Sequence, residues 1–248
     1  MAVTRREMLM GTGKLASGLA LGVPAMNAMG EVQSTSQPAE RKLKVIVTGG
    51  HPGDPEYGCG GTIARYTDLG HEVVLLYMNN GAWPPTPAAT RVAEAEKACE
   101  ILKARPAYVG QLNGHAVVDN EHYEKFRRLL DAEKPDVVLN QWPIDHHPDH
   151  RALTTLVLDA WLQSHKKFAL YYYEVGEDTM MFTPTEFVDI SALEARKRAA
   201  CYAHASQTPD YWYPLQTQIT KFRGAESGYA QAEGFARHWQ SKGNMLPG

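Results

Sequence analysis

Short apolar runs alternate along this chain with longer segments in which apolar residues recur at helical spacing. The apolar runs predict strands over residues 42–50, 71–80, 106–112, 135–142, 168–175 and 185–191. The segments with helical spacing predict helices over residues 59–70, 90–104, 122–134, 149–165, 192–206 and 228–240. Because strands and helices alternate, we expect a single α/β domain with a mostly parallel sheet and helices on both of its faces.

Residues 1–40 differ from this pattern and are expected to be an export signal followed by a polar linker. Arg5 and Arg6 precede a weakly apolar run over residues 15–28, which is too short and too interrupted by glycine and proline to span a bilayer. This arrangement indicates a twin-arginine signal, with an ordinary secretion signal or an uncleaved anchor as alternatives. We therefore expect the folded domain over residues 41–248, in a periplasmic or secreted protein that has no stable membrane span after signal removal.

Charge and cysteine content narrow the classes of partner and of metal site. The net charge is -3 and the isoelectric point is about 6.4, so the basic excess typical of nucleic-acid or anionic-membrane binding is missing from the sequence. Three widely spaced cysteines form neither a disulfide framework nor a CxxC zinc signature. Any metal would therefore be held by histidine and carboxylate ligands. The sequence leaves the oligomeric state open.

Two loops carry dense polar chemistry, and each follows a predicted strand. The loop after the first strand contains His51, Asp54 and Glu56. The loop after the fourth strand contains Asp145, His146, His147, Asp149 and His150. Ligands of open parallel sheets bind at the carboxyl ends of the strands, so the two loops are expected to meet. Two imidazoles and a carboxylate from separate loops can hold zinc and leave one coordination position open to water, as in hydrolytic sites.

The motifs at these loops, together with two later segments, resemble the PIG-L/LmbE family of zinc-dependent N-deacetylases. The segments are HPGDPEYGCGGTIA (51–64), HPDH (147–150), FVDISALEARKRAACYAHASQ (187–207) and GYAQAEGFARH (228–238). The resemblance extends over most of residues 43–240. It implies a Rossmann-like fold and a hydrolase that removes an acetyl or other acyl group from an N-acylated amino sugar or a related conjugate. The expected partner is therefore a small-molecule or glycan substrate.

The resemblance also implies roles for individual residues at the site. His51, Asp54 and His150 would be the ligands of Zn²⁺, although histidine and aspartate sites accept other divalent metals. His147 would stabilise the oxyanion or protonate the leaving amine. Asp149 would orient and charge-support a histidine.

The role of a further residue, Arg91, has two interpretations. The family often has an arginine at this place that faces the substrate. An arginine near the start of a helix is also commonly a solvated residue.

Gly53 departs from the family pattern, in which an aspartate at this position is the general base. A positioned base typically contributes about 10² to 10⁴ in rate, so its replacement has three possible meanings. Asp145 could reach the same water, whereas Glu56 is nearer in sequence but could serve a structural hydrogen bond. Alternatively His147 shuttles the proton, or the protein is a weakly catalytic zinc-holding glycan binder or performs non-hydrolytic sugar chemistry. We favour retained hydrolysis, because the second loop has more titratable groups than binding alone needs; the base stays unassigned, with Asp145 as the leading candidate.

Overall fold

The computed structural model describes residues 41–248, and the predicted export signal and linker lie outside the described residues. A seven-stranded sheet with the order β3-β2-β1-β4-β5-β7-β6 forms the centre. Its strands are β1 (Lys44–Gly49), β2 (Glu72–Asn79), β3 (Arg105–Gln111), β4 (Val137–Gln141), β5 (Ala169–Tyr173), β6 (Glu186–Asp189) and β7 (Ala232–Arg237). Neighbouring strands from β3 to β5 are parallel, while β7 is antiparallel to both β5 and β6.

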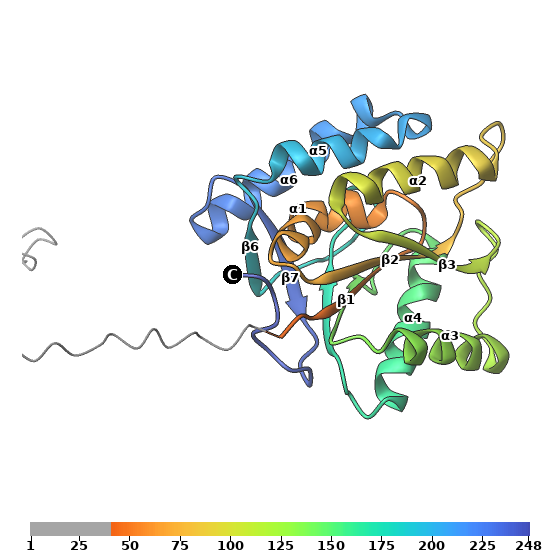
Figure 1. Ribbon diagram of the computed structural model, residues 1–248. Helices are drawn as coiled ribbons and strands as arrows, with labels where there is room; N and C mark the ends of the chain where they lie inside the picture. The colour runs from red at the N-terminus through yellow and green to blue at the C-terminus, as the bar shows by residue number, and fades with distance from the viewer. Residues whose placement is uncertain (1–40) are drawn as a thin grey trace, which may run out of the picture. The chain divides into compact units, whose positions relative to one another are not determined.

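Helices lie on both faces of the sheet, as Figure 1 shows. One side carries α1 (Asp54–Asp68), α2 (Ala88–Leu102), α5 (Glu194–Ala203) and α6 (Pro209–Ser227), with a short 3-10 turn, η1 (Ala205–Gln207), between the last two. The other side carries α3 (Asn120–Glu133) and α4 (Pro148–Gln163). The predicted α/β architecture, a Rossmann-like mostly parallel sheet with helices on both faces in a single domain, is confirmed.

The core has two halves because successive side chains of a strand point to opposite faces. In β1, Val45 and Val47 pack with the α1, α2 and α5 side, whereas Ile46 packs with the α3 and α4 side. All three side chains are fully buried. A parallel strand covered on both faces is apolar along most of its length, which explains why this run could be predicted as a strand from the sequence.

The predicted helix over residues 228–240 is wrong, because residues 232–237 form strand β7. Its sequence, AEGFAR, consists largely of good helix formers, but it lies between β5 and β6 and pairs with both. A Cβ atom on Gly234 would lie 2.9 Å from Cβ of Pro184, so β7 passes close to the segment that precedes β6. Long-range pairing therefore overrides the local preference for helix.

A buried ion pair joins β7 to α5. Nζ of Lys197 lies 2.5 Å from Oε1 of Glu233, and each side chain is only 1% exposed. Glu233 also accepts hydrogen bonds from the backbone N–H groups of Gly61 and Thr62, at 2.9 and 2.7 Å. The carboxylate thus connects α1, α5 and β7.

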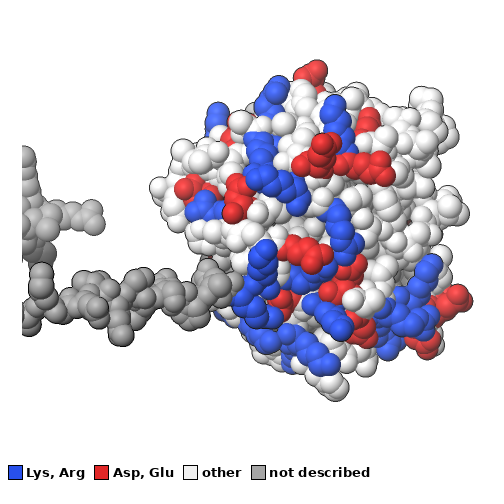
Figure 2. Space-filling view, in the orientation of Figure 1, with Lys and Arg blue, Asp and Glu red and all other residues white. Residues whose placement is uncertain are grey.

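The described surface carries no large field of one charge on the face drawn in Figure 2, where acidic and basic side chains are interspersed. Among residues 41–248, no helix combines the length and the apolar character that crossing a bilayer requires.

Candidate active site

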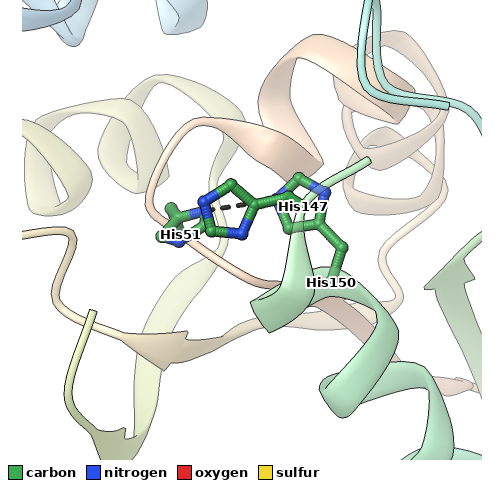
Figure 3. A group of neighbouring side chains, drawn as sticks. All are labelled: His51, His147 and His150. Atoms are coloured by element: carbon green, nitrogen blue, oxygen red, sulfur yellow. Dashed lines mark hydrogen bonds between the residues drawn. The ribbon is translucent and has the colours of Figure 1, made fainter. Parts of the chain in front are cut away.

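Four polar side chains converge where β1 and β4 end. His51 lies in the turn after β1, and Asp54 is the first residue of α1. His147 is the N-cap of α4, and His150 lies in its first turn. β1 and β4 are neighbours in the sheet, so both loops open at the same edge. Figure 3 shows the three imidazoles gathered there.

Three ligand atoms form a compact triangle. Nδ1 of His51 lies 3.2 Å from Nε2 of His150 and 3.4 Å from Oδ2 of Asp54. Nε2 of His150 lies 3.1 Å from the same aspartate oxygen. Tetrahedral zinc with bonds of about 2.0–2.2 Å separates its ligand atoms by about 3.3 Å, so the spacing fits such an ion.

A buried carboxylate lies behind each imidazole. Oδ2 of Asp149 is 3.2 Å from Nε2 of His51, and Oδ1 of Asp145 is 3.0 Å from Nδ1 of His150. Both imidazoles therefore present one nitrogen to the triangle and the other to a carboxylate. This pairing fixes the ring orientation and tautomer of histidines that bind metals.

The position of Asp145 corrects the expectation that it is the general base. Its side chain is buried, at 1% exposure, and Oδ1 also accepts a hydrogen bond of 2.7 Å from the backbone N–H of His147. It faces Nδ1 of His150, whereas Nε2 of that ring faces Asp54. The imidazole thus lies between Asp145 and the triangle, so Asp145 positions His150 and does not reach a water at the triangle.

Charges in the cluster favour a cation at the triangle. Burial lowers the pKa of His150, but Asp54 and Asp145 outweigh burial and raise that pKa to about 10. Burial raises the pKa of Asp54, but His150 and His51 hold it well below its usual range. Burial likewise opposes ionisation of Asp149, yet hydrogen bonds from His51 and from the Gly114 N–H lower its pKa to about 2. The carboxylates of Asp54 and Asp149 are therefore ionised and attract positive charge.

His147 lies at the edge of the triangle. Its Nδ1 accepts a hydrogen bond of 3.2 Å from the N–H of Asp149, so in the neutral ring Nε2 carries the proton. Burial and the neighbouring His51 and His150 lower its pKa, which favours this neutral form. Nitrogen atoms of the three imidazoles lie within 4.8 Å of one another, a wider spacing than in the triangle that includes Asp54. His147 therefore offers an N–H donor beside the triangle.

Gly53 is the N-cap of α1 and has a φ of 113°, a conformation that residues with side chains rarely adopt. Its N–H donates a hydrogen bond of 3.1 Å to Oε2 of Glu56. The other oxygen of Glu56 accepts from Tyr77 at 2.7 Å and lies 3.0 Å from Nε2 of His204. Glu56 is fully buried in these contacts, which agrees with the structural role considered for it.

Arg91 is neither solvated nor free, since it is only 2% exposed. Its Nη2 donates a hydrogen bond of 2.5 Å to the carbonyl of Pro52, and Nη1 lies 3.3 Å from Oε2 of Glu94. The guanidinium thus holds the loop between His51 and Asp54. It also lines the cavity next to that loop.

A cavity of about 170 Å³ opens beside the triangle. Its lining includes His51, Gly53 and Asp54 from the first loop, Tyr57 and Trp212 from helices, and Glu177 and Asp178 from the loop after β5. A second groove of about 560 Å³ shares His51, Arg91 and Gln207 and extends to His147, Asn113 and Trp83.

The sequence interpretation missed Glu177 and Asp178. The available signal was their place: two adjacent carboxylates follow a strand that runs parallel to β4. The carboxyl end of that strand opens at the same edge of the sheet as those of β1 and β4.

Comparisons with known proteins identify the family. Residues 46–161 match the PIG-L family, described as GlcNAc-PI de-N-acetylase. A diacetylchitobiose deacetylase of Thermococcus kodakarensis is 28% identical over 231 residues, which cover 80% of this chain and 84% of that protein.

Solved structures agree with this family match. A conserved protein of Thermus thermophilus is 26% identical with a TM-score of 0.70, covering 83% of this chain and 96% of that one. The N,N'-diacetylchitobiose deacetylase of Pyrococcus horikoshii is 25% identical with a TM-score of 0.70, covering 79% and 84%. The fold, the family match and these relatives together show that the chain contains a PIG-L (LmbE-like) family domain.

Proposed function

We propose that this protein is a metal-dependent N-deacetylase that removes the acetyl group from an N-acetylated amino sugar or a conjugate of one. The observation that carries the proposal is the triangle of His51, Asp54 and His150, with a buried carboxylate behind each imidazole. Zinc is the metal that this donor set and spacing fit best. The triangle leaves an open side toward the cavity, as a catalytic site requires.

The chemistry divides between the metal and the chain. Bound zinc supplies Lewis acidity, which polarises an acyl carbonyl and makes water more acidic. Nε2–H of His147 is placed to donate a hydrogen bond to the developing oxyanion or a proton to the leaving nitrogen. Arg91 keeps the first loop in place through the Pro52 carbonyl. Overall, one water is consumed, the amide C–N bond breaks, and a carboxylic acid and an amine are released.

The substrate class follows from two features. Relatives of this chain are deacetylases named for diacetylchitobiose, an N-acetylated disaccharide. The cavity and the adjoining groove each contain a tryptophan, Trp212 and Trp83, and aromatic rings commonly pack against the apolar faces of ligands. A substrate of one or two N-acetylated sugar residues would fill the cavity and enter the groove.

The site of action is proposed from the twin-arginine pattern at Arg5 and Arg6. Export of a folded protein would allow metal loading before the membrane is crossed. Replacing both arginines by lysine should retain the full chain inside the cell, which fractionation and immunoblotting would detect. Unchanged export of this variant would contradict the twin-arginine route.

The direct test is amine release from a panel of N-acetylated mono- and disaccharides by zinc-loaded protein. Asp54→Ala is the blank, because it removes one corner of the triangle. Release by the wild type but not by the variant would support a metal-dependent deacetylase. Zinc-loaded wild-type protein that releases no amine from any member of the panel would contradict the proposal.

A second candidate function is favoured by Gly53, which supplies no carboxylate at the cavity. The protein could hold zinc and bind an N-acetylated glycan without cleaving it efficiently. Calorimetry would separate the two functions: tight glycan binding without amine release fits the binding protein, and release fits the enzyme. Conversion of the sugar without release of an amine would indicate non-hydrolytic chemistry.

A further inference from the structure

The loop after β5 brings two carboxylates to the cavity and is fixed there by its backbone. The N–H of Asp178 donates to the carbonyl of Val175 at 3.1 Å, and its own carbonyl accepts from the N–H of His146 at 2.8 Å. Two residues further along, the N–H of Met180 donates to the carbonyl of Ile144 at 3.0 Å. The loop is therefore joined to the segment that leads into His147 and is held against the site.

Other carboxylates near the triangle are committed to different contacts. Asp145 faces Nδ1 of His150, Asp149 faces Nε2 of His51, and Glu56 is bonded to Gly53, Tyr77 and His204. Within residues 41–248, the carboxylates that line the cavity besides Asp54 are those of Glu177 and Asp178. A carboxylate that accepts a proton at the cavity must therefore be one of these two.

Asp178 fits the role better than Glu177. Its carboxylate is half-buried and has no hydrogen bond or ion pair with any other described residue, whereas Glu177 is more exposed and accepts from its own backbone N–H. Asp178 lines the same cavity as His51 and Asp54, and the charges of His150, Asp54, Asp145 and His51 act on its carboxylate. Burial raises the pKa of Asp178, which strengthens the carboxylate as a base.

We propose that Asp178 is the general base of the deacetylation, an inference that rests on the function proposed above. Its carboxylate takes one proton from the attacking water while the water oxygen forms a bond to the acyl carbon. The C–N bond then breaks, and the proton passes to the leaving nitrogen, so the carboxylate is regenerated. No further reactant is needed.

Gly53 is compatible with this assignment. A Cβ atom at position 53 would meet only His204 and Tyr57, each at 3.9 Å, so the glycine leaves its side of the cavity open. The base therefore comes from the loop after β5 instead of from the loop after β1.

The test compares Asp178→Asn with Glu177→Gln in the full zinc-loaded protein, using N,N'-diacetylchitobiose as the probe. Asp178→Asn should lower kcat by about 10² to 10⁴, the usual contribution of a positioned base. Zinc content, thermal unfolding and the calorimetric Kd for the sugar should stay at their wild-type values. Glu177→Gln should lower kcat less than Asp178→Asn does, and Asp178→Glu should recover part of the lost rate.

The pH profile adds a readout that a structural role would not change. The base acts only when ionised, so kcat/KM of the wild type should fall as pH drops through the pKa of Asp178, above the range of an ordinary aspartate. The charged groups that act on it are His150, Asp54, Asp145 and His51, with Glu177 beside it in the loop. In the Asp178→Asn variant, this fall of kcat/KM at low pH should disappear.

The outcomes separate the two proposals. An active wild type whose Asp178→Asn variant keeps its kcat, or whose Glu177→Gln variant loses it instead, would overturn Asp178 as the base and leave the deacetylase standing. Wild-type protein that loads zinc and releases no amine from the whole panel would overturn the proposed function and the base assignment together.

Discussion

At the scale of single residues, the backbone conformation of Gly53 restricts substitutions at this position more than the space around it does. The φ of 113° is strained for any residue with a Cβ atom, although space for that atom exists. Restoring an aspartate at this position would therefore strain the turn between His51 and Asp54 unless the backbone relaxes.

Gly53→Ala is expected to lower the free energy of unfolding by about 1–3 kcal/mol, the usual cost of such a conformation. Urea unfolding would measure the change. Gly243→Ala is the control, since Gly243 has no positive φ and its Cβ would lie 3.4 Å from the flexible end of Arg237. Equal stability of the Gly53 variant and the wild type would show that the turn relaxes without cost.

The role of Asp145 likewise depends on where its side chain lies in the fold. Because it supports His150 from behind, Asp145→Asn is expected to weaken zinc binding by about 10- to 100-fold, as loss of such a partner does. Competition with a chromogenic chelator would measure the zinc affinity. Asp131→Asn changes an exposed carboxylate of α3 and should leave the affinity unchanged. Undiminished zinc affinity in Asp145→Asn would contradict this positioning role.

At the scale of elements, the pair Lys197–Glu233 fastens β7 to two helices. Lys197→Met would leave Glu233 buried without its cation, and removing one partner of a buried pair costs about 3–5 kcal/mol. Chemical unfolding should show this loss. Lys103→Met breaks the exposed pair with Asp68 and should cost at most about 1 kcal/mol. Similar losses in both variants would argue against a special role for the buried pair.

Elements with apolar periodicity were predictable, and those without it were not. α6 was not predicted because its buried positions include Gln216, Thr220 and Arg223, and Pro214 lies inside it. Neither the apolar pattern nor the helix propensity marks such a segment. The helix after the first strand was predicted to begin at Cys59, whereas α1 already begins at Asp54.

At the scale of the whole molecule, metal binding is expected to couple to stability, because the triangle joins the loop after β1 to α4. Zinc at about 100 times its Kd should stabilise the fold by about 2.7 kcal/mol, and chelation should reverse this. Thermal unfolding with zinc and with excess chelator would measure the shift. Asp54→Ala should unfold at the same temperature in both conditions. A wild-type protein indifferent to zinc would contradict a metal site at the triangle.

The amino-acid sequence by itself determined the parallel sheet and the two loops that meet at its edge. Buried parallel strands are mostly apolar, and their carboxyl ends lie at one edge of the sheet, so both features can be predicted from the linear pattern. Placement of His51, Asp54 and His150 in one cluster follows from the same rule.

Only the tertiary structure decided where the carboxylates lie. It determined which imidazole nitrogen each buried aspartate faces and which loop brings carboxylates to the cavity. Asp145 is two residues from His147 in sequence, yet it lies behind His150. Asp178 is distant in sequence from both motifs, yet it lines the cavity. Strand β7 likewise forms from a helix-prone segment. Each of these outcomes depends on contacts between segments far apart in the chain, which local pattern and propensity do not encode.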